Sequence, residues 1–182
     1  RRSKPPPAPT DTSHAPGGPN TDTPVRIEQL RQTLRSHGAL ACHEERVLRA
    51  WTAALPLASG ARRQRAEDYL PRRIRESLPA LEGDLNALAG VRSAHTGEDG
   101  SERLLVELAD GQTVESVLLP RDGLCVSTQV GCAVGCLFCM TGRDGLLRQL
   151  DSAEIVAQVV LGRARRSVRR VVFMGMGEPA HN

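Results

Sequence analysis

Three cysteines in one short loop constrain this chain more than any other feature. Cys132, Cys136 and Cys139 follow an apolar run that begins at Leu124, and their spacing is Cys-x3-Cys-x2-Cys. Thiolates are soft ligands that favour iron–sulfur clusters, zinc or Cu(I), and three so close in sequence can converge on one centre. A cubane 4Fe-4S cluster usually takes four cysteines, so three would leave one iron with an open coordination position. We expect Phe138 to shield one side of such a cluster from water.

Two other uses of these thiols stay open from the residues alone. Zinc sites usually combine two cysteine or histidine arms a dozen or more residues apart. This chain has one such arm, and the nearest histidines, His95 and His181, are remote in sequence. A redox pair of Cys136 and Cys139 would leave Cys132 without a role. The spacing therefore favours a cluster-binding loop over zinc or redox use.

The motif Cys132-x3-Cys136-x-Phe138-Cys139 resembles the signature of radical S-adenosylmethionine (SAM) enzymes. The longer run CVSTQVGCAVGCLFCMTG, together with GMGEP at 175–179, resembles the RNA adenine methyltransferases of the RlmN/Cfr type. The resemblance extends from about Val25 to the end of the chain and is most specific over 115–182.

This resemblance implies a role for each matching residue. The three loop cysteines would hold a 4Fe-4S cluster, and the amine and carboxylate of SAM would bind its open iron. Glu115 matches a family glutamate proposed to accept the proton lost from the adenine. Cys125 matches a cysteine proposed to form a transient disulfide with a distant methyl-carrying cysteine. The SAM site would be formed by Gly175, Met176, Gly177 and Glu178.

On pattern alone, these residues also have simpler explanations. Glu115 stands among apolar residues in TVESVLLP, as an ordinary strand glutamate does, and Cys125 can be a small buried residue. Glycine-rich turns after strands are common, although Gly175 and Gly177 would let the backbone come close to a small polar ligand. A proton-accepting Glu115 needs a partly dry site, where its pKa can be tuned toward neutrality.

The family mechanism uses SAM twice. One SAM methylates a cysteine near the C-terminus, and an electron from the cluster cleaves a second SAM. The resulting 5′-deoxyadenosyl radical removes hydrogen from that methyl group, and the carbon radical adds to an adenine ring carbon of ribosomal or transfer RNA. C2 is the first expectation, and C8, the antibiotic-resistance variant, is the second. We also expect an electron donor such as flavodoxin, and a monomeric protein.

Composition limits the compartment and the partners. The longest apolar runs are far short of a membrane span. Five cysteines, three of them clustered, fit a reducing cytosol better than a disulfide framework, so we expect a cytoplasmic protein without membrane contact. Residues 25–90 carry 11 arginines against 8 acidic residues, and residues 91–182 carry 10 against 11. This weak positive excess favours the N-terminal part as the side that meets a polyanion.

Residues 1–24 are rich in Pro, Gly, Ser and Thr, which predicts a disordered tail. From 25 to 90 the apolar spacing predicts helices over about 27–35, over a segment that contains Val47, Trp51 and Leu55, and over 61–69, 72–78 and 81–88. The family resemblance implies that 25–90 is a small helical accessory domain that contacts RNA, and we interpret Cys42 as a partly buried small residue. The region contains a basic cluster, for which phosphate and solvent remain alternative partners; its members are Arg62, Arg63, Arg65, Arg72, Arg73 and Arg75.

Residues 91–182 predict a β-extension followed by the first part of a radical SAM core. Period-two patterns predict strands over 91–96, 103–108 and 113–119. A strand over 124–129, a helix opened by a capping box at Asp151 and Glu154, and a strand over 168–174 form a βαβ unit with a parallel pair. Both the cysteine loop and GMGEP follow the carboxyl ends of their strands, so we expect them on one rim. The predicted fold class is α/β, an incomplete (βα) barrel.

The sequence also departs from the family pattern. No cysteine follows Cys139, so the methyl carrier is absent from these 182 residues. The chain opens on Arg1 and stops at Asn182, and both ends look cut, so we expect an N-terminal fragment whose parallel sheet has an open edge. Such a fragment would take up a cluster but would not methylate RNA. Another radical SAM enzyme and a non-catalytic cluster- or zinc-binding module are the remaining alternatives.

Overall fold

The structure is a computed structural model that describes residues 26–60 and 65–182. The predicted tail and the start of the predicted 61–69 helix lie outside these ranges. The helices are α1 (Ile27–Ser36), α2 (Ala41–Thr52), α3 (Arg72–Ala87) and α4 (Ser152–Arg165), with 3-10 turns η1 (Ala66–Asp68), η2 (Met140–Gly142) and η3 (Pro179–His181). The strands are β1 (Ala89–Thr96), β2 (Glu102–Leu108), β3 (Thr113–Leu119), β4 (Gly123–Cys125), β5 (Gln129–Gly131), β6 (Leu146–Gln149) and β7 (Arg170–Val172).

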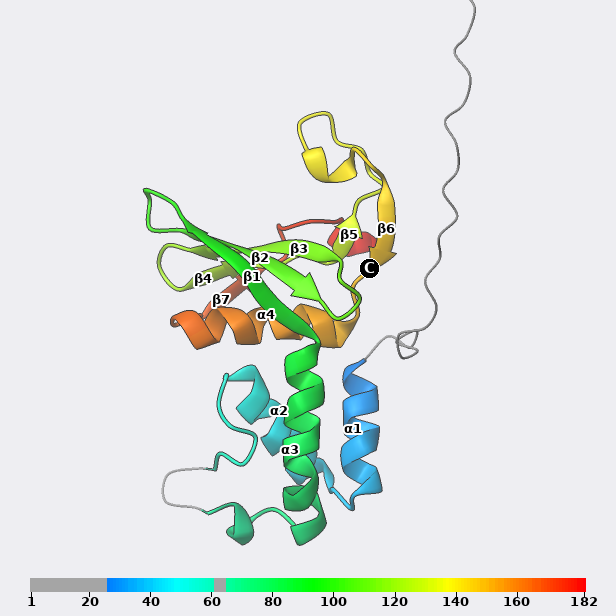
Figure 1. The fold of residues 1–182 in the computed structure, drawn as a ribbon, viewed down its shortest axis with the longest axis vertical. Coiled ribbons are helices and arrows are strands. Elements are labelled where there is room, and N and C mark those ends of the chain that lie inside the picture. The colour runs from blue at the N-terminus through cyan, green and yellow to red at the C-terminus, as the bar shows by residue number, and fades with distance from the viewer. Residues whose placement is uncertain (1–25, 61–64) are drawn as a thin grey trace, which may run out of the picture.

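The molecule has three parts arranged in succession: a helical part made of α1–α3, the helix α4, and the main sheet (Figure 1). Helices α1–α3 form one end, α4 lies across the middle, and the main sheet covers α4. One hydrophobic core runs through all three, from Leu30 and Trp51 in the helical part to Leu104, Leu124 and Ala157 around α4. Within the described ranges, no helix is both long and apolar enough to span a membrane.

The main sheet has the strand order β1-β2-β3-β4-β7. The first four strands pair antiparallel, and β4 pairs parallel with β7 through the α4 crossover, with Cys125 opposite Val172. The predicted meander and βαβ unit are therefore confirmed, within a mixed α/β fold whose sheet is mostly antiparallel. A second sheet holds only β5 and β6. The sequence did not predict β6, whose residues Leu146 and Leu147 are both exposed.

The two faces of the main sheet differ sharply. Val114, Ser116 and Leu118 of β3 are fully buried on the face that α4 covers. Gly162 of α4 lets the helix approach closely, because a Cβ there would lie 2.9 Å from Leu124 Cδ2. Alternation along the strand puts Glu115 on the opposite, uncovered face. This face is the one available to a ligand or substrate.

The predicted 124–129 strand is two strands in the structure, and the break is at Ser127. Val126 still donates to the Val172 carbonyl of β7 at 2.9 Å. At Ser127 the side chain of Gln158 takes over, because it accepts from the Ser127 N–H and donates to its carbonyl, both at 2.9 Å. With its backbone groups satisfied by α4, Ser127 leaves the ladder, and the chain enters the smaller sheet at Gln129. The predicted strand over 168–174 is likewise shorter, since β7 ends at Val172.

The two short helices predicted on either side of Pro79 are wrong, because α3 runs through this proline without a break. The apolar residues Ile74, Leu78, Leu81 and Leu85 form one buried stripe along the helix. Pro79 itself lies on the exposed side. Burial of this stripe outweighs the missing N–H bond and the contact of the ring with the preceding turn.

Two smaller expectations for the helical part are also wrong. Cys42 is exposed rather than partly buried. Helix α2 ends at Thr52, and Leu55 lies beyond it on the surface. The helix starting at Arg72, the one ending near Ser36 and the capping box at Asp151 are confirmed.

Replacing Pro79 with alanine should stabilise the protein. In a helix interior, alanine is up to about 3 kcal/mol more favourable than proline, because the N–H bond is restored and the ring clash is removed. The unfolded chain also becomes more flexible, which offsets roughly 1 kcal/mol of this gain. We expect a gain of about 1–2 kcal/mol in the free energy of unfolding, measured by urea denaturation. Pro71→Ala is the matched control, since Pro71 precedes the helix. An equal response of the two variants would contradict the interpretation.

Candidate functional site

The cysteine loop is closed at its base by a tight backbone contact. Cys132 N–H donates to the Gly145 carbonyl at 3.0 Å, which joins the two ends of the loop. Gly131 has a φ of +76°, and a Cβ there would lie 2.1 Å from the same carbonyl oxygen. Only glycine fits at such a position, so the sequence of the β5 end determines how the loop leaves the sheet.

All three predicted ligands lie on this loop as free thiols, and Cys136 and Cys139 are exposed. Cys139 N–H donates to the Cys136 carbonyl at 3.0 Å, and a hydrogen bond from the Thr141 hydroxyl lowers the pKa of the Cys139 thiol. In the part of the chain that the structure describes, no three His, Cys, Asp or Glu side chains are gathered as metal ligands. The loop therefore carries the three thiols of the motif, but their sulfur atoms are not gathered around one point.

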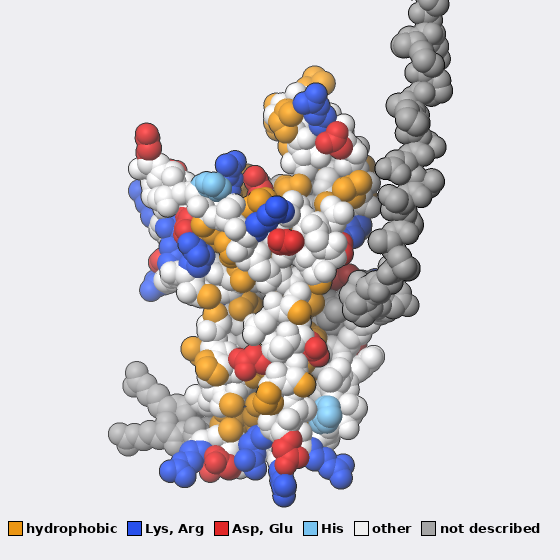
Figure 2. Space-filling model, viewed as in Figure 1, with side chains coloured by type: hydrophobic (Ala, Val, Ile, Leu, Met, Phe, Trp, Pro, Cys, Tyr) orange, Lys and Arg blue, Asp and Glu red, His pale blue; other side chains and the backbone are white. Residues whose placement is uncertain are grey.

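The tip of the cysteine loop is apolar and exposed. Leu137 is fully exposed, Phe138 is 93% exposed, and Met140 is exposed as well. Figure 2 shows hydrophobic side chains at the tip of the loop that rises above the sheet. The shielding role expected for Phe138 stays a prediction, because its ring packs against no core in this structure.

The glycine-rich turn at 175–178 lies against the chain between β4 and β5. Gly175 N–H donates to the Val126 carbonyl at 3.1 Å, and a Cβ at Gly175 would lie 2.6 Å from Ser127 Oγ. Gly177 has a φ of +101°, and a Cβ there would lie 2.6 Å from Gln129 Cβ. Both glycines thus allow a close approach to side-chain and backbone atoms of the 126–129 segment. The same contacts hold the turn beside the base of the cysteine loop.

Two glutamine side chains connect the turn to the small sheet. Gln129, which is buried, accepts from Glu178 N–H at 2.9 Å and donates to Gln149 Oε1 at 2.9 Å. Gln149 in turn donates to the His181 carbonyl at 2.7 Å. The Glu178 carboxylate accepts from Ala180 N–H at 3.0 Å and caps η3. The cysteine loop and the glycine-rich turn are therefore parts of one hydrogen-bonded unit.

Glu115 and Cys125 lie on the uncovered face of the sheet. Cys125 is opposite Val117, and Glu115 lies two residues before Val117, so both side chains project from the same face. The Glu115 side chain is 45% exposed and lies 3.6 Å from the Arg103 guanidinium. Cys125 is buried, and this burial raises the pKa of its thiol. A carboxyl group and a buried thiol thus share the face of the sheet opposite α4.

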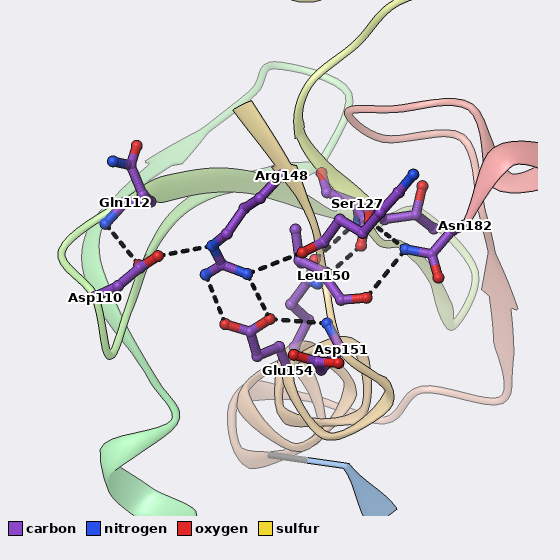
Figure 3. Close-up of polar contacts among 11 residues, drawn as sticks. Asp110, Gln112, Ser127, Arg148, Leu150, Asp151, Glu154 and Asn182 are labelled. Carbon is purple, nitrogen blue, oxygen red and sulfur yellow. Dashed lines mark hydrogen bonds and ion pairs between the residues drawn. The ribbon is translucent and has the colours of Figure 1, made fainter. Parts of the chain in front are cut away.

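Arg148 of β6 ties the small sheet to two other elements (Figure 3). It donates to both carboxylate oxygens of Glu154, at 2.9 and 2.8 Å, and to Asp110 in the β2–β3 turn at 2.7 Å. Glu154 also accepts from Asp151 N–H at 2.9 Å, so the α4 cap and the β6 anchor share one carboxylate. Asn182 adds a further contact, since its amide donates to the Leu150 carbonyl at 3.0 Å.

Sequence reasoning missed the residues that hold the site together. Gln158, Gln129 and Arg148 have no role in the quoted motifs, and each has at least one partner 20 or more positions away in sequence. Gln158 could have been noticed as a polar residue in the middle of α4, one turn after Glu154, on the face that is otherwise made of Ala and Gly. Nothing in the local sequence distinguishes Arg148 from an ordinary surface arginine.

No protein-family model matches the chain. Its relatives include proteins described as "Probable RNA methyltransferase" from Dechloromonas aromatica, 73% identical, and from Aromatoleum aromaticum, 75% identical, each over 158 residues. These alignments cover 87% of this chain and 44% of each relative, so the chain spans less than half the length of the curated relatives it matches. A solved radical SAM methyltransferase from Sphaerobacter thermophilus aligns with a TM-score of 0.60 at 33% identity, over 87% of this chain and 47% of that one.

Replacing Gly131 with alanine should open the base of the cysteine loop. The matched control is Gly145→Ala, because Gly145 also has a positive φ, +78°, but has open space where a Cβ would point. We expect Gly145→Ala to cost about 1 kcal/mol of strain and Gly131→Ala at least about 2 kcal/mol more, from collision with backbone. Thermal and urea unfolding measure both. Similar losses for the two variants would show that the contact with Gly145 is unimportant.

The Asp110–Arg148 pair should make stability depend on acid pH. Burial acts to raise the pKa of Asp110, but the hydrogen bonds from Arg148 and from Gln112 N–H outweigh it, and the pKa is lowered. A carboxyl whose folded-state pKa lies below its unfolded-state pKa stabilises at neutral pH, and this stabilisation is lost as the pH falls through the folded-state pKa.

We therefore expect the stability difference between the wild type and Asp110→Asn to shrink as the pH falls from about 6 to 3. The difference at neutral pH should stay below about 1 kcal/mol, since the site is partly solvated. Asp84→Asn, an exposed position on α3, is the control. A difference that is constant over this pH range would contradict the assignment.

Proposed function

We propose that this chain is the front part of a radical SAM enzyme that methylates an adenine ring carbon of RNA. One observation carries the proposal. The glycine-rich turn follows β7 and is hydrogen-bonded to Gln129 of β5, the strand from which the cysteine loop starts, beside a face that presents Glu115 and Cys125. The names of the relatives and of the solved neighbour, an RNA methyltransferase and a radical SAM methyltransferase, support the same class.

The donor set suits a 4Fe-4S cluster in its chemistry. Three thiols stand on the loop itself, and a cubane cluster held by three cysteines leaves one iron position open for SAM. We propose that Cys132, Cys136 and Cys139 hold this cluster and that the exposed loop draws the thiols together on binding. When bound, such a cluster supplies the electron that cleaves SAM.

The other residues bind and orient. Gly175, Met176, Gly177 and Glu178 present a turn beside the loop, and we propose that this turn holds the amino-acid part of SAM. Glu115 would accept the proton from the adenine ring, with Arg103 keeping its carboxylate in place. Cys125, as thiolate, would attack the sulfur of a methyl-carrying cysteine, so that a disulfide forms while the bond from that sulfur to the product carbon breaks and its electron pair leaves with the product. These 182 residues supply no cysteine after Cys139 for this role.

The remaining parts of the proposal concern the whole protein. The βαβ unit would be the first section of a (βα) barrel, and the helical part, 25–90, an accessory domain that contacts ribosomal or transfer RNA. C2 of adenine is the preferred position, with C8 as the second candidate. We further propose a monomeric cytoplasmic enzyme reduced by a flavodoxin-like donor.

Anaerobic reconstitution with iron and sulfide tests the cluster loop. We expect the chain to take up about four irons and to give, after reduction, an EPR signal that changes when SAM is added. Cys132→Ala, Cys136→Ala and Cys139→Ala should each abolish this signal, because each removes one of three ligands. Cys42→Ala is the matched control, since Cys42 is exposed and lies outside the loop.

Two results would contradict the assignment. Stoichiometric zinc without bound iron would favour a zinc module. A reduced cluster whose EPR signal does not change when SAM is added would exclude an open iron.

The chain with its cluster should leave adenine in RNA unmethylated, because the methyl-carrying cysteine is missing from these residues. Nucleoside mass spectrometry of the RNA checks this.

A further inference from the structure

The Ser127 hydroxyl joins two parts of the proposed site that come from different strands. It donates to the Glu115 carbonyl of β3 at 2.6 Å and accepts from the Met176 N–H of the glycine-rich turn at 2.8 Å. Ser127 is fully buried, so water does not compete for either bond. The backbone of the proposed proton acceptor and the backbone of the proposed SAM-binding turn therefore meet at one oxygen atom.

Gln158 of α4 fixes the orientation of this serine. Its Oε1 accepts from Ser127 N–H at 2.9 Å and from the Ser116 hydroxyl at 2.8 Å, and its Nε2 donates to the Ser127 carbonyl at 2.9 Å. Gln158 is fully buried as well. Because Gln158 bonds both the N–H and the carbonyl of Ser127, a change in the Ser127 backbone dihedrals would leave buried polar groups unpaired.

The glycine-rich turn is shaped to reach this hydroxyl. A Cβ at Gly175 would lie 2.6 Å from Ser127 Oγ and 2.7 Å from the Val126 carbonyl oxygen. A side chain at 175 would therefore displace Met176 from its bond to Ser127. The contact therefore requires both residues: Gly175 leaves room for Ser127 Oγ, and the Ser127 hydroxyl accepts from Met176 N–H.

We propose that Ser127, oriented by Gln158, is a positioning residue that sets the distance between Glu115 and the SAM-binding turn. Neither side chain touches a substrate; both act through the backbone that they hold. The inference rests on the proposed function for the roles of Glu115 and the turn, but the junction itself can be tested without any cofactor.

Amide hydrogen exchange of the cofactor-free chain is the first test. Ser127→Ala removes both bonds of the hydroxyl, so exchange in the peptide that contains Met176 should become at least about tenfold faster. Thr128→Val is the matched control: it changes the next residue, whose buried hydroxyl has no partner among the described residues. Unchanged protection in Ser127→Ala, or equal loss in Thr128→Val, would overturn the inference.

SAM binding to the reconstituted chain is the second test. We expect Ser127→Ala to keep its full iron content but to bind SAM about tenfold more weakly, by titration of the SAM-dependent EPR change. Gln158→Glu, which retains the size but not the amide donor, should weaken SAM binding in the same direction and serves if Ser127→Ala does not fold. Wild-type affinity in both variants would overturn the inference.

The two tests separate this inference from the proposed function. If the wild-type chain shows no SAM response at all, the proposed function fails, while the exchange experiment still decides whether the junction holds the turn. If SAM binds normally to a chain whose turn has lost protection, the junction exists but does not position the cofactor, and the inference fails alone.

Discussion

The pairing of the Gln158 amide with both backbone groups of Ser127 is the interaction on which the rest of the site depends. It takes the chain out of the main sheet at the end of β4, which is why the following residues can form a separate small sheet with β6. The cysteine loop hangs from that small sheet. Without the bonds from Gln158, β4 would continue along β7. The chain would then not enter the small sheet, and the cysteine loop could not start after Gly131.

The direction of α4 follows from the same region. Its first turn is fixed by the Asp151–Glu154 cap, in which Glu154 also binds Arg148. Its middle places Gln158 within hydrogen-bond distance of the Ser127 backbone. Gly162 then allows the last turns to approach Leu124. The helix is therefore positioned at three points by three kinds of contact: an ion pair, an amide clamp and close packing. Each lies within the βαβ unit that presents the candidate site.

Much of this fold could be predicted from local pattern, and the exceptions share a cause. The strands of the meander, α4 and its cap depend on alternation and capping chemistry, which are local signals. The break at Ser127 depends on a residue 31 positions away, and the continuity of α3 through Pro79 depends on what its apolar stripe packs against. The cysteine ligands could be proposed because their spacing is itself the signal, whereas Arg148 and Gln129 act through distant partners.

The glycines illustrate the same division. Gly175 and Gly177 were expected to admit a ligand, and the structure gives them a second task, contact with the Val126–Gln129 segment. The N–H groups of Gly175, Met176 and Glu178 all donate to this segment. These bonds hold the turn in one conformation, and a preorganised turn binds a ligand at lower entropic cost.

Ion pairs of arginines in the helical part differ in the burial of the carboxylate partner. Glu44 is buried and accepts from Arg31 at 3.1 Å and from Arg35 at 2.7 Å, and the Arg35 hydrogen bond lowers the pKa of Glu44. These two arginines hold α1 against α2, and releasing them would leave a buried carboxylate unpaired.

The pairs Arg49–Glu45 and Arg72–Glu76 are exposed and lie within single helices. Exposed pairs of this kind contribute about 0–1 kcal/mol, so a phosphate can replace the carboxylate at little cost. The positive excess counted from the sequence is therefore not uniformly available to RNA. A polyanion can therefore reach Arg49 and Arg72 of the exposed pairs, while Arg31 and Arg35 on Glu44 are structural.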